Sequence, residues 1–176
     1  MECVIIGGGP SVTQDQIARV LDWRTKAKTR HIFAVDKVFE EVPTSDYCFS
    51  RDTKFLHAYA YELENFKGQV IVGNTCFTPE WAEVHKADAY ISGAACIQAA
   101  AHMGHLLIYL IGADGHHKGG EHWLTNYVNL KNAPNYEKFD SYYADALQTV
   151  TGIDVYNLSP GTAIESVPTM EFDEVM

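Results

Sequence analysis

Short apolar runs alternate with amphipathic segments along almost the whole chain. Strand-like runs occupy residues 2–6, 31–36, 47–50, 68–73, 106–112 and 155–158. Stripes with apolar positions three and four residues apart predict helices over residues 12–23, 53–64 and 136–150. A helix of small residues is expected to begin with Ser92 as its N-cap and to stop at Gly104, and a short helix is expected around Trp81. This alternation predicts an α/β fold, namely a single-domain, Rossmann-like, mostly parallel sheet with helices on both faces.

Length and charge narrow the class of protein. The chain has 176 residues, of which 47% are hydrophobic and 20% charged, so we expect one nucleotide-binding domain over residues 1–168. Residues 169–176 are acidic and are expected to form a mobile tail. The formal net charge of −10 disfavours nucleic acid as a partner, because nucleic-acid binders present a basic face. A homo-oligomer is compatible with the sequence.

Targeting signals and cysteines bear on the compartment. No apolar run reaches the roughly 18 residues that a transmembrane helix needs, and no basic segment precedes an apolar leader, so we expect a cytoplasmic protein. The four cysteines, Cys3, Cys48, Cys76 and Cys96, form no CxxC pair and lie in or beside apolar segments. This arrangement predicts buried free thiols in a reducing compartment.

The segment Gly7-Gly8-Gly9-Pro10-Ser11 follows the first apolar run and precedes the first predicted helix. Glycines allow backbone amides to approach a phosphate, and the following helix terminus favours negative charge. The motif departs from GxGxxG because Val12 occupies the third glycine position. Ser11 and Gln14 also fit a capping box, so a plain strand-to-helix turn is an equal alternative to a phosphate site.

Polar residues follow several other predicted strands. Asp36, the segment 50–52 and the segment 112–117 each end an apolar run, and Ser92-Gly93 begins a helix. Because the carboxyl ends of parallel strands gather at one edge, we expect these residues to surround a concave small-molecule site.

The loop after residue 112 is rich in ionisable groups. Asp114, His116, His117 and His122 are of types that bind divalent metals, although their spacing matches no closed zinc signature. A histidine there could instead act in acid–base chemistry near neutral pH, and a solvated loop without chemistry is the third reading.

Five segments in order resemble a known family, the bacterial sialyltransferases of lipooligosaccharide synthesis. The similar segments are the GxGPS loop at residues 7–11, Ser92-Gly93, the IYLIGAD run at 108–114, the APNY segment at 133–136, and the last helix and strand over residues 144–160. The resemblance implies a glycosyltransferase that binds a CMP-sugar donor and a small carbohydrate acceptor, with no metal or other cofactor required.

The resemblance also implies roles for individual residues. It places the loop at residues 7–11 near the phosphate and ribose, and Ser92-Gly93 near the ribose or base. On this basis we expect Gly8, Gly9, Ser11, Asp36, Ser92 and Gly93 to bind the nucleotide, and Asp114, His116 and His122 to lie near the chemistry. The chain departs from the family pattern where Gly8 and Asp36 replace asparagines and where His116 replaces a tyrosine. The segment that holds the family's catalytic histidine is shortened here and has none. We hypothesise that His116, His117 or His122 takes over the base or the phosphate-stabilising role.

Two other functions remain open from the sequence. One is a diphosphokinase-like transferase on a related fold, acting on a nucleoside triphosphate with magnesium. The other is a non-catalytic nucleotide-binding protein that keeps the pocket without the reaction.

Overall fold

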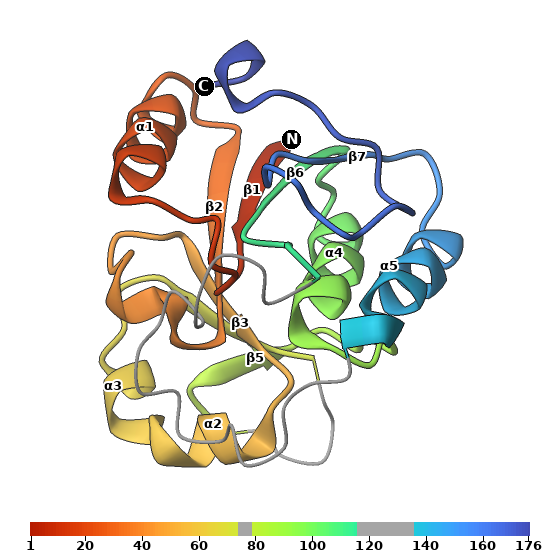
Figure 1. The fold of residues 1–176 in the computed structure, drawn as a ribbon. Coiled ribbons are helices and arrows are strands. Elements are labelled where there is room, and N and C mark those ends of the chain that lie inside the picture. The colour runs from red at the N-terminus through yellow and green to blue at the C-terminus, as the bar shows by residue number, and fades with distance from the viewer. Residues whose placement is uncertain (74–78, 116–135) are drawn as a thin grey trace.

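A computed structural model describes residues 1–73, 79–115 and 136–176. The described residues form a seven-stranded parallel sheet in the order β5-β4-β3-β2-β1-β6-β7 (Figure 1). Its strands are β1 (Glu2–Ile6), β2 (Arg30–Val35), β3 (Tyr47–Ser50), β4 (Gln69–Val72), β5 (Ala82–Val84), β6 (Leu107–Ile111) and β7 (Asp154–Asn157). The predicted α/β, Rossmann-like single domain is confirmed.

Strand β1 lies at the centre of the sheet, between β2 and β6. Cys3 pairs with His31 on one side and with Ile108 on the other, and the register continues to Ile6. Successive strands are added on the β2 side as far as β5, and then the chain returns to the other side of β1 for β6 and β7. The direction of winding therefore reverses between β1 and β6, which is where open α/β sheets bind ligands.

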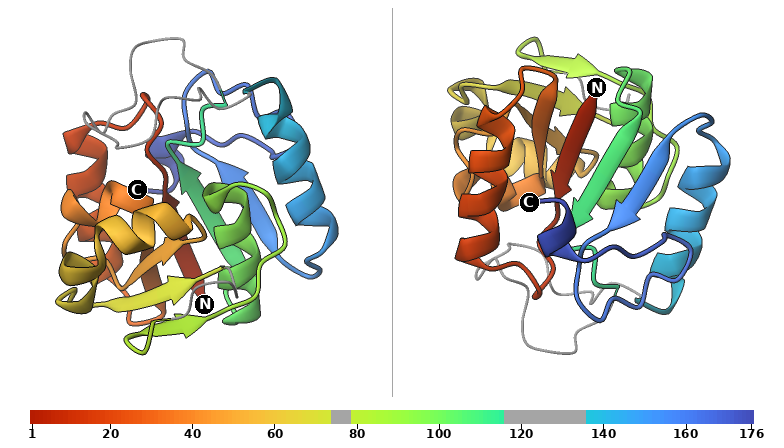
Figure 2. Two further views of the ribbon diagram at one scale, coloured as in Figure 1. Left: turned by 90° about the horizontal axis from the view of Figure 1, so that it is seen from below. Right: turned by 90° about the horizontal axis from the view of Figure 1, so that it is seen from above.

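Helices cover both faces of the sheet (Figure 2). One face packs against α1 (Gln14–Thr25), the 3₁₀ helix η1 (Asp36–Glu40), α2 (Thr53–Ala58) and α3 (Ala60–Glu64). The opposite face packs against α4 (Ser92–His102) and α5 (Phe139–Gln148), which follows the short 3₁₀ helix η2 (Tyr136–Lys138). Ala94, Ala95, Ala99 and Ala100 of α4 are fully buried, because small side chains let this helix lie close to β1, β2 and β3.

Two predicted elements are wrong. The expected helix near Trp81 is instead the edge strand β5, which is only partly buried and pairs with β4 alone. The expected helix over residues 53–64 is interrupted at Tyr59, whose φ of −112° and ψ of 20° lie outside the helical range and divide it into α2 and α3. Gly104 does end α4 as expected, with a φ of 88°.

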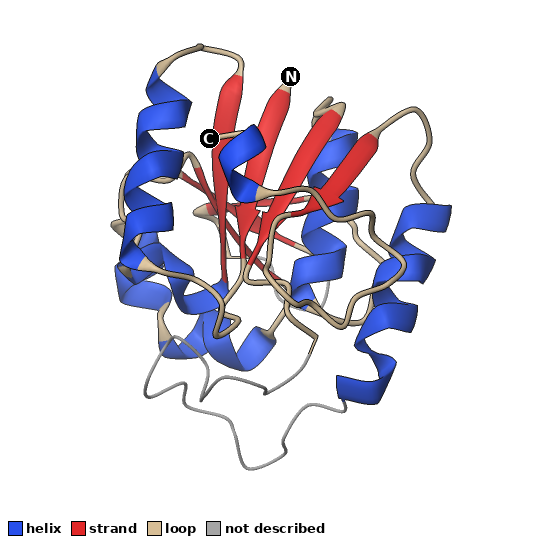
Figure 3. Cartoon of the chain, turned by 45° about the horizontal axis from the view of Figure 1, so that its top comes forward, coloured by secondary structure: helices blue, strands red, loops and turns tan. Residues whose placement is uncertain are grey.

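The carboxyl-terminal segment returns to the face of α1 (Figure 3). Thr169 forms a bridge with Asn157, and residues Phe172–Glu174 form the 3₁₀ helix η3. Arg19 of α1 lies over the Phe172 ring at 4.7 Å and pairs with Asp173 at 2.5 Å. The mobility expected of residues 169–176 stays a prediction.

Cys3, Cys48 and Cys96 are free and buried, as predicted, and burial raises the pKa of each thiol. Cys76 lies outside the described residues. Among the described helices, none combines the length and the apolar character needed to cross a bilayer.

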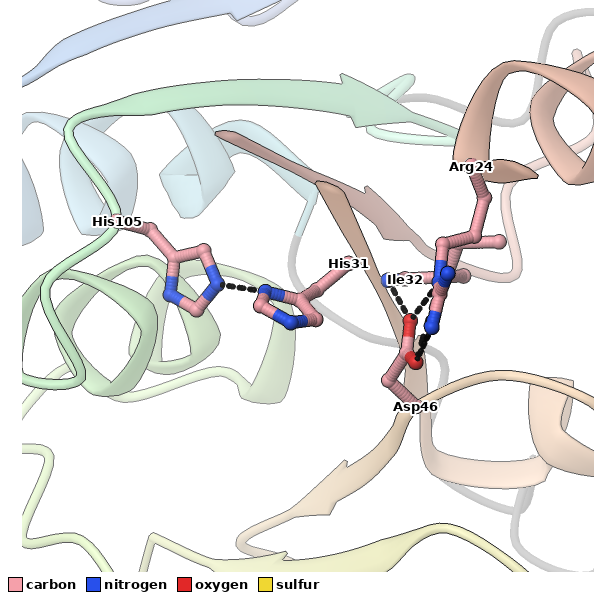
Figure 4. Close-up of polar contacts among 5 residues, drawn as sticks. All are labelled: Arg24, His31, Ile32, Asp46 and His105. Atoms are coloured by element: carbon pink, nitrogen blue, oxygen red, sulfur yellow. Dashed lines mark hydrogen bonds and ion pairs between the residues drawn. The ribbon is translucent and has the colours of Figure 1, made fainter. Parts of the chain in front are cut away.

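The amino edge of the sheet carries its own polar cluster (Figure 4). Asp46 receives two-pronged hydrogen bonds from Arg24, at 2.6 and 2.9 Å, and a third from the Ile32 amide at 2.8 Å. Beside it, His105 is fully buried, with its Nδ1 3.0 Å from the Ala100 carbonyl and its Nε2 2.8 Å from His31 Nδ1. These contacts join β2, β3 and the start of β6 at the edge opposite the predicted ligand site.

Candidate functional site

A cavity of about 510 Å³ lies at the carboxyl edge of the sheet, at the point where the winding reverses. Backbone bonds extend the β1–β6 pairing into this edge, because Gly7 N donates to the Ile111 carbonyl at 2.8 Å and Gly9 N donates to the Gly112 carbonyl at 3.1 Å. The described residues that line the cavity come from four strand ends and two helices: Gly7, Gly8, Gly9, Pro10, Val35, Asp36, Arg51, Asp52, Tyr90, Ile91, Ser92, Gly93, Gly112, Ala113, Asp114, Gly115, Tyr136, Phe139 and Tyr143. The predicted convergence of strand ends is therefore present.

The glycine loop is held tightly by its neighbours. A Cβ atom at Gly9 would overlap the Asp114 carboxylate and the Gly112 carbonyl, so only glycine fits there. Ser11 N donates to Asp114 Oδ2 at 3.3 Å. The amides of Gly7, Gly9 and Ser11 thus serve the protein itself, and the loop shapes the cavity more than it supplies donors to it.

The first helix begins later than predicted. Thr13, and not Ser11, is the N-cap of α1, and Gln16 completes the capping box. Gln16 N donates to Thr13 Oγ1 at 3.2 Å while Thr13 N donates to Gln16 Oε1 at 2.9 Å. The delay follows from the bonds of Gly9 and Ser11, which hold the chain against the Gly112–Asp114 turn before it can coil. As a result, the amino terminus of α1 is satisfied internally.

Ser11 itself lies behind the loop and is not among the cavity-lining residues. Its hydroxyl oxygen is buried without a hydrogen-bond partner in the described part of the chain. The backbone, rather than the hydroxyl, links this residue to the site through Asp114.

Asp36 stands between β3 and α4. Its φ of 51° places it in the left-handed region, which aspartate tolerates better than most residues, and it turns the chain from β2 into η1. Ser50 Oγ donates to Asp36 Oδ1 at 2.6 Å, and the Ser92 hydroxyl also hydrogen-bonds this carboxyl. Burial outweighs these two hydrogen bonds and raises the pKa of Asp36 to about 7. The cavity therefore contains a carboxyl group that exchanges a proton near neutral pH.

Helix α4 presents an open amino terminus to the cavity. Ser92 is the first residue of the helix rather than its predicted N-cap, and the actual cap, Ile91, makes no side-chain bond to the helix. The first amides of an uncapped helix lack intrahelical partners and carry partial positive charge. Ser92 and Gly93 line the cavity, so these donors lie where an anionic ligand group could reach them.

Gly93 is required by close packing against α5. A Cβ atom at this position would lie 2.5 Å from the Tyr143 hydroxyl oxygen. Tyr143 is almost fully buried, and burial raises the pKa of its phenol, which keeps it a neutral hydrogen-bond donor. Tyr143 thus fixes the position of the α4 terminus from behind.

The expected catalytic loop is only partly described. Asp114 is 3% exposed and binds the Ser11 amide, so it orders the glycine loop. His116, His117 and His122 lie outside the described residues. Within the described ranges no group of three or more His, Cys, Asp or Glu side chains is arranged to hold a metal ion.

Several cavity residues had no assigned role in the sequence. Arg51 directly follows β3, and only its place at a strand end pointed to the site. The other additions are aromatic, since Tyr90, Tyr136 and Phe139 line one side of the cavity and Tyr142 stacks on Tyr90 with centroids 5.0 Å apart. Tyr90 is 73% exposed, and an aromatic doublet at residues 142–143 was the available signal for this side.

Comparison with known proteins points to the same class of fold. The chain superposes on the crystal structure of the sialyltransferase CST-II in complex with a trisaccharide acceptor and CMP, with a TM-score of 0.59 and 15% sequence identity. The match covers 96% of this chain and 85% of the sialyltransferase chain. No protein-family model matches the sequence, and no curated protein gives a significant sequence match. The chain therefore has a sialyltransferase-like fold.

Proposed function

We propose that this protein is a glycosyltransferase that binds a nucleotide sugar, of the CMP-sugar type, at the carboxyl edge of its sheet. The observation that carries the proposal is the open amino terminus of α4 in a cavity at the reversal point of a sialyltransferase-like fold. A nucleotide phosphate needs amide donors and a positive dipole end, and α4 offers both, whereas the start of α1 is already capped.

The remaining nucleotide contacts follow from the cavity. In this proposal Ser92 and Gly93 bind the phosphate, and Asp36 meets a ribose or base hydroxyl or amine, as carboxylates at the end of a second strand do in related sheets. Gly8 and Gly9 let the ligand approach the backbone, and Ser11 acts indirectly through Asp114.

The transfer reaction needs a group that stabilises the leaving phosphate and a group that accepts the proton of the acceptor hydroxyl. The bond between the anomeric carbon and the phosphate oxygen breaks through an oxocarbenium-like centre, and the acceptor hydroxyl oxygen forms the new bond and loses its proton. The α4 amides stabilise the departing nucleotide phosphate. We assign this proton to a histidine of the sequence that follows Gly115, His116 or His122, because imidazole accepts protons near neutral pH. No metal or cofactor takes part in this scheme.

The aromatic side of the cavity suits a carbohydrate acceptor. Tyr90 is exposed and supported from behind by Tyr142, with their rings 28° from parallel. An aromatic ring held this way offers a flat surface to the C–H face of a sugar. The cytoplasmic location that we propose is compatible with the three buried free thiols.

Thermal shift and calorimetric titration with CMP, CDP, ATP and NAD, each with and without magnesium, test the proposal. We expect CMP to stabilise the protein without metal, and we expect a Ser92→Pro variant, which alters the open helix terminus, to lose that effect. Stabilisation only by a triphosphate with magnesium would support the diphosphokinase alternative. Binding of a CMP-sugar without hydrolysis or transfer would indicate a non-catalytic binding protein, and no response to any nucleotide would refute all three.

A further inference from the structure

Arg51 differs from the other arginines of the chain. Arg19, Arg24 and Arg30 pair with Asp173, Asp46 and Glu2. Arg51 lines the cavity, and its Nη1 atom is buried without a hydrogen-bond partner among the described residues. A guanidinium group stays charged at physiological pH, and leaving one of its buried N–H groups unpaired destabilises the folded protein.

The carboxylates nearest in sequence and in the cavity are engaged elsewhere. Asp52 caps its own helix, with Oδ1 accepting from Lys54 N at 2.9 Å and from Phe55 N at 3.4 Å. Asp36 is bound by Ser50 and Ser92, and Asp114 by the Ser11 amide. None of these three forms an ion pair with Arg51 among the described contacts, so none of them neutralises the guanidinium.

Arg51 and the α4 terminus line the same cavity, as does Asp36. Ser50, the residue before Arg51, bonds one side of Asp36, and Ser92 bonds it as well. Arg51 is the one basic residue among the described cavity-lining residues, in a protein whose net charge is −10. An anion that enters this cavity therefore meets two favourable features, a helix terminus and a single guanidinium.

We propose that Arg51 is the receptor for an oxyanion group of the ligand, either a phosphoryl or a carboxylate group. The identity of the ligand as a CMP-sugar rests on the function proposed above, whereas the anion site rests on the unpaired Arg51 Nη1 atom in the cavity. The planar guanidinium donates two parallel hydrogen bonds to either kind of oxyanion, and such charge-assisted bonds are the stronger ones in proteins.

Calorimetric titration of cytidine, CMP and CMP-N-acetylneuraminate into three proteins tests the site. The proteins are the wild type, Arg51→Gln, and the matched control Arg19→Gln, which removes the same charge from the surface of α1. If the oxyanion is the phosphoryl group, Arg51→Gln lowers CMP affinity about 10- to 100-fold and leaves cytidine affinity unchanged. If it is the sugar carboxylate, the variant binds cytidine and CMP normally and loses affinity only for the CMP-sugar. Equal affinities of Arg51→Gln and wild type for all three ligands would overturn the proposal.

Two further measurements show whether a loss of binding comes from misfolding of the variant, from the choice of ligand, or from an incorrect assignment of Arg51. Because the unpaired Nη1 group is a cost in the folded protein, ligand-free Arg51→Gln should melt at or above the wild-type temperature, and Arg51→Lys should keep part of the binding. If the wild type binds no cytidine compound, the proposed function fails, and inorganic phosphate and N-acetylneuraminate become the probes. A rise in melting temperature with either anion, against chloride of equal ionic strength, that is absent in Arg51→Gln would then support the anion site. No Arg51-dependent rise would refute it.

Discussion

Replacing Asp36 with asparagine should change how the stability of the protein depends on pH. Asparagine keeps the shape of the side chain and an oxygen that accepts the 2.6 Å hydrogen bond from Ser50, but it cannot ionise. In the wild type, burial raises the pKa of this carboxyl from 3.8 to about 7. The folded protein therefore holds a proton on Asp36 at pH values where the unfolded chain has released it.

The sign and size of the effect follow from this difference. Stability from the protonated Asp36 is fully present below pH 3.8, falls as the pH rises, and is lost above about pH 7. A pKa difference of this size corresponds to roughly 4 kcal/mol between the two protonation states. Water that reaches this cavity-lining side chain reduces the figure, so we expect the Asp36→Asn protein to gain about 1–3 kcal/mol over wild type between pH 4.5 and pH 8.5.

Urea denaturation of both proteins across this pH range measures the gain, because all other titrating groups cancel in the difference between them. A Ser50→Ala variant provides a control that keeps the Asp36 carboxyl but should raise its pKa further. It removes a hydrogen bond that favours the ionised carboxyl, so its stability should fall over a range that extends to higher pH. Parallel stability curves for wild type and Asp36→Asn would show that the carboxyl ionises as freely in the folded protein as in the unfolded one.

Three other predictions follow from individual contacts. Gly93→Ala should destabilise the protein by about 1–3 kcal/mol, because its methyl group would lie 2.5 Å from the Tyr143 hydroxyl, and the same change in a Tyr143→Phe background should cost less; equal costs in thermal unfolding would contradict the contact. Burial lowers the pKa of both His31 and His105, so their contribution to stability is fully present above the ordinary histidine pKa of 6.5 and is lost as the pH falls through the lowered pKa values. His31→Gln should therefore make the protein lose less stability in acid; an unchanged loss in urea denaturation across this pH range would argue against the pair. Tyr90→Ala should weaken acceptor binding without changing CMP affinity or melting temperature, because the ring is 73% exposed; equal loss of CMP affinity would place this ring at the nucleotide instead.

The central strands were predictable because each is an apolar run long enough to fill a sheet that is covered on both faces. Residues 2–6 and 47–50 match β1 and β3, and the other central strands shift by a residue or two. Edge strand β5 was not predictable, since Ala82–Val84 has only three residues, one of them the charged Glu83, and is paired on one side only. The break at Tyr59 was equally hidden, because the apolar stripe continues across it from Phe55 to Leu63.

The edge that carries the candidate site could be predicted, but the part that each residue takes could not. Parallel strands bring Asp36, Arg51 and Asp114 together by topology alone. The three residues differ in their hydrogen-bond partners. Asp114 is bound by an amide that is 103 positions away in the chain, Asp36 by hydroxyls from β3 and α4, and the buried Nη1 of Arg51 by no described group. Such differences arise from contacts between segments that are far apart in the sequence, so a local sequence pattern cannot predict them.

The two helix termini at this edge show why a glycine-rich turn by itself is a weak signal for phosphate. In the GGGPS turn the amides of Gly7, Gly9 and Ser11 bond the end of β6 and the turn after it, and Thr13 and Gln16 then cap α1. At α4 the Ser92 hydroxyl turns toward Asp36 and leaves the helix amides uncapped, because the preceding residue, Ile91, has no group that could bond them. A helix terminus without a side-chain cap, such as that of α4, is therefore the stronger candidate for an anion site in this fold. Under the proposed function we expect the ligand phosphate at α4, next to the glycine turn that lines the same cavity.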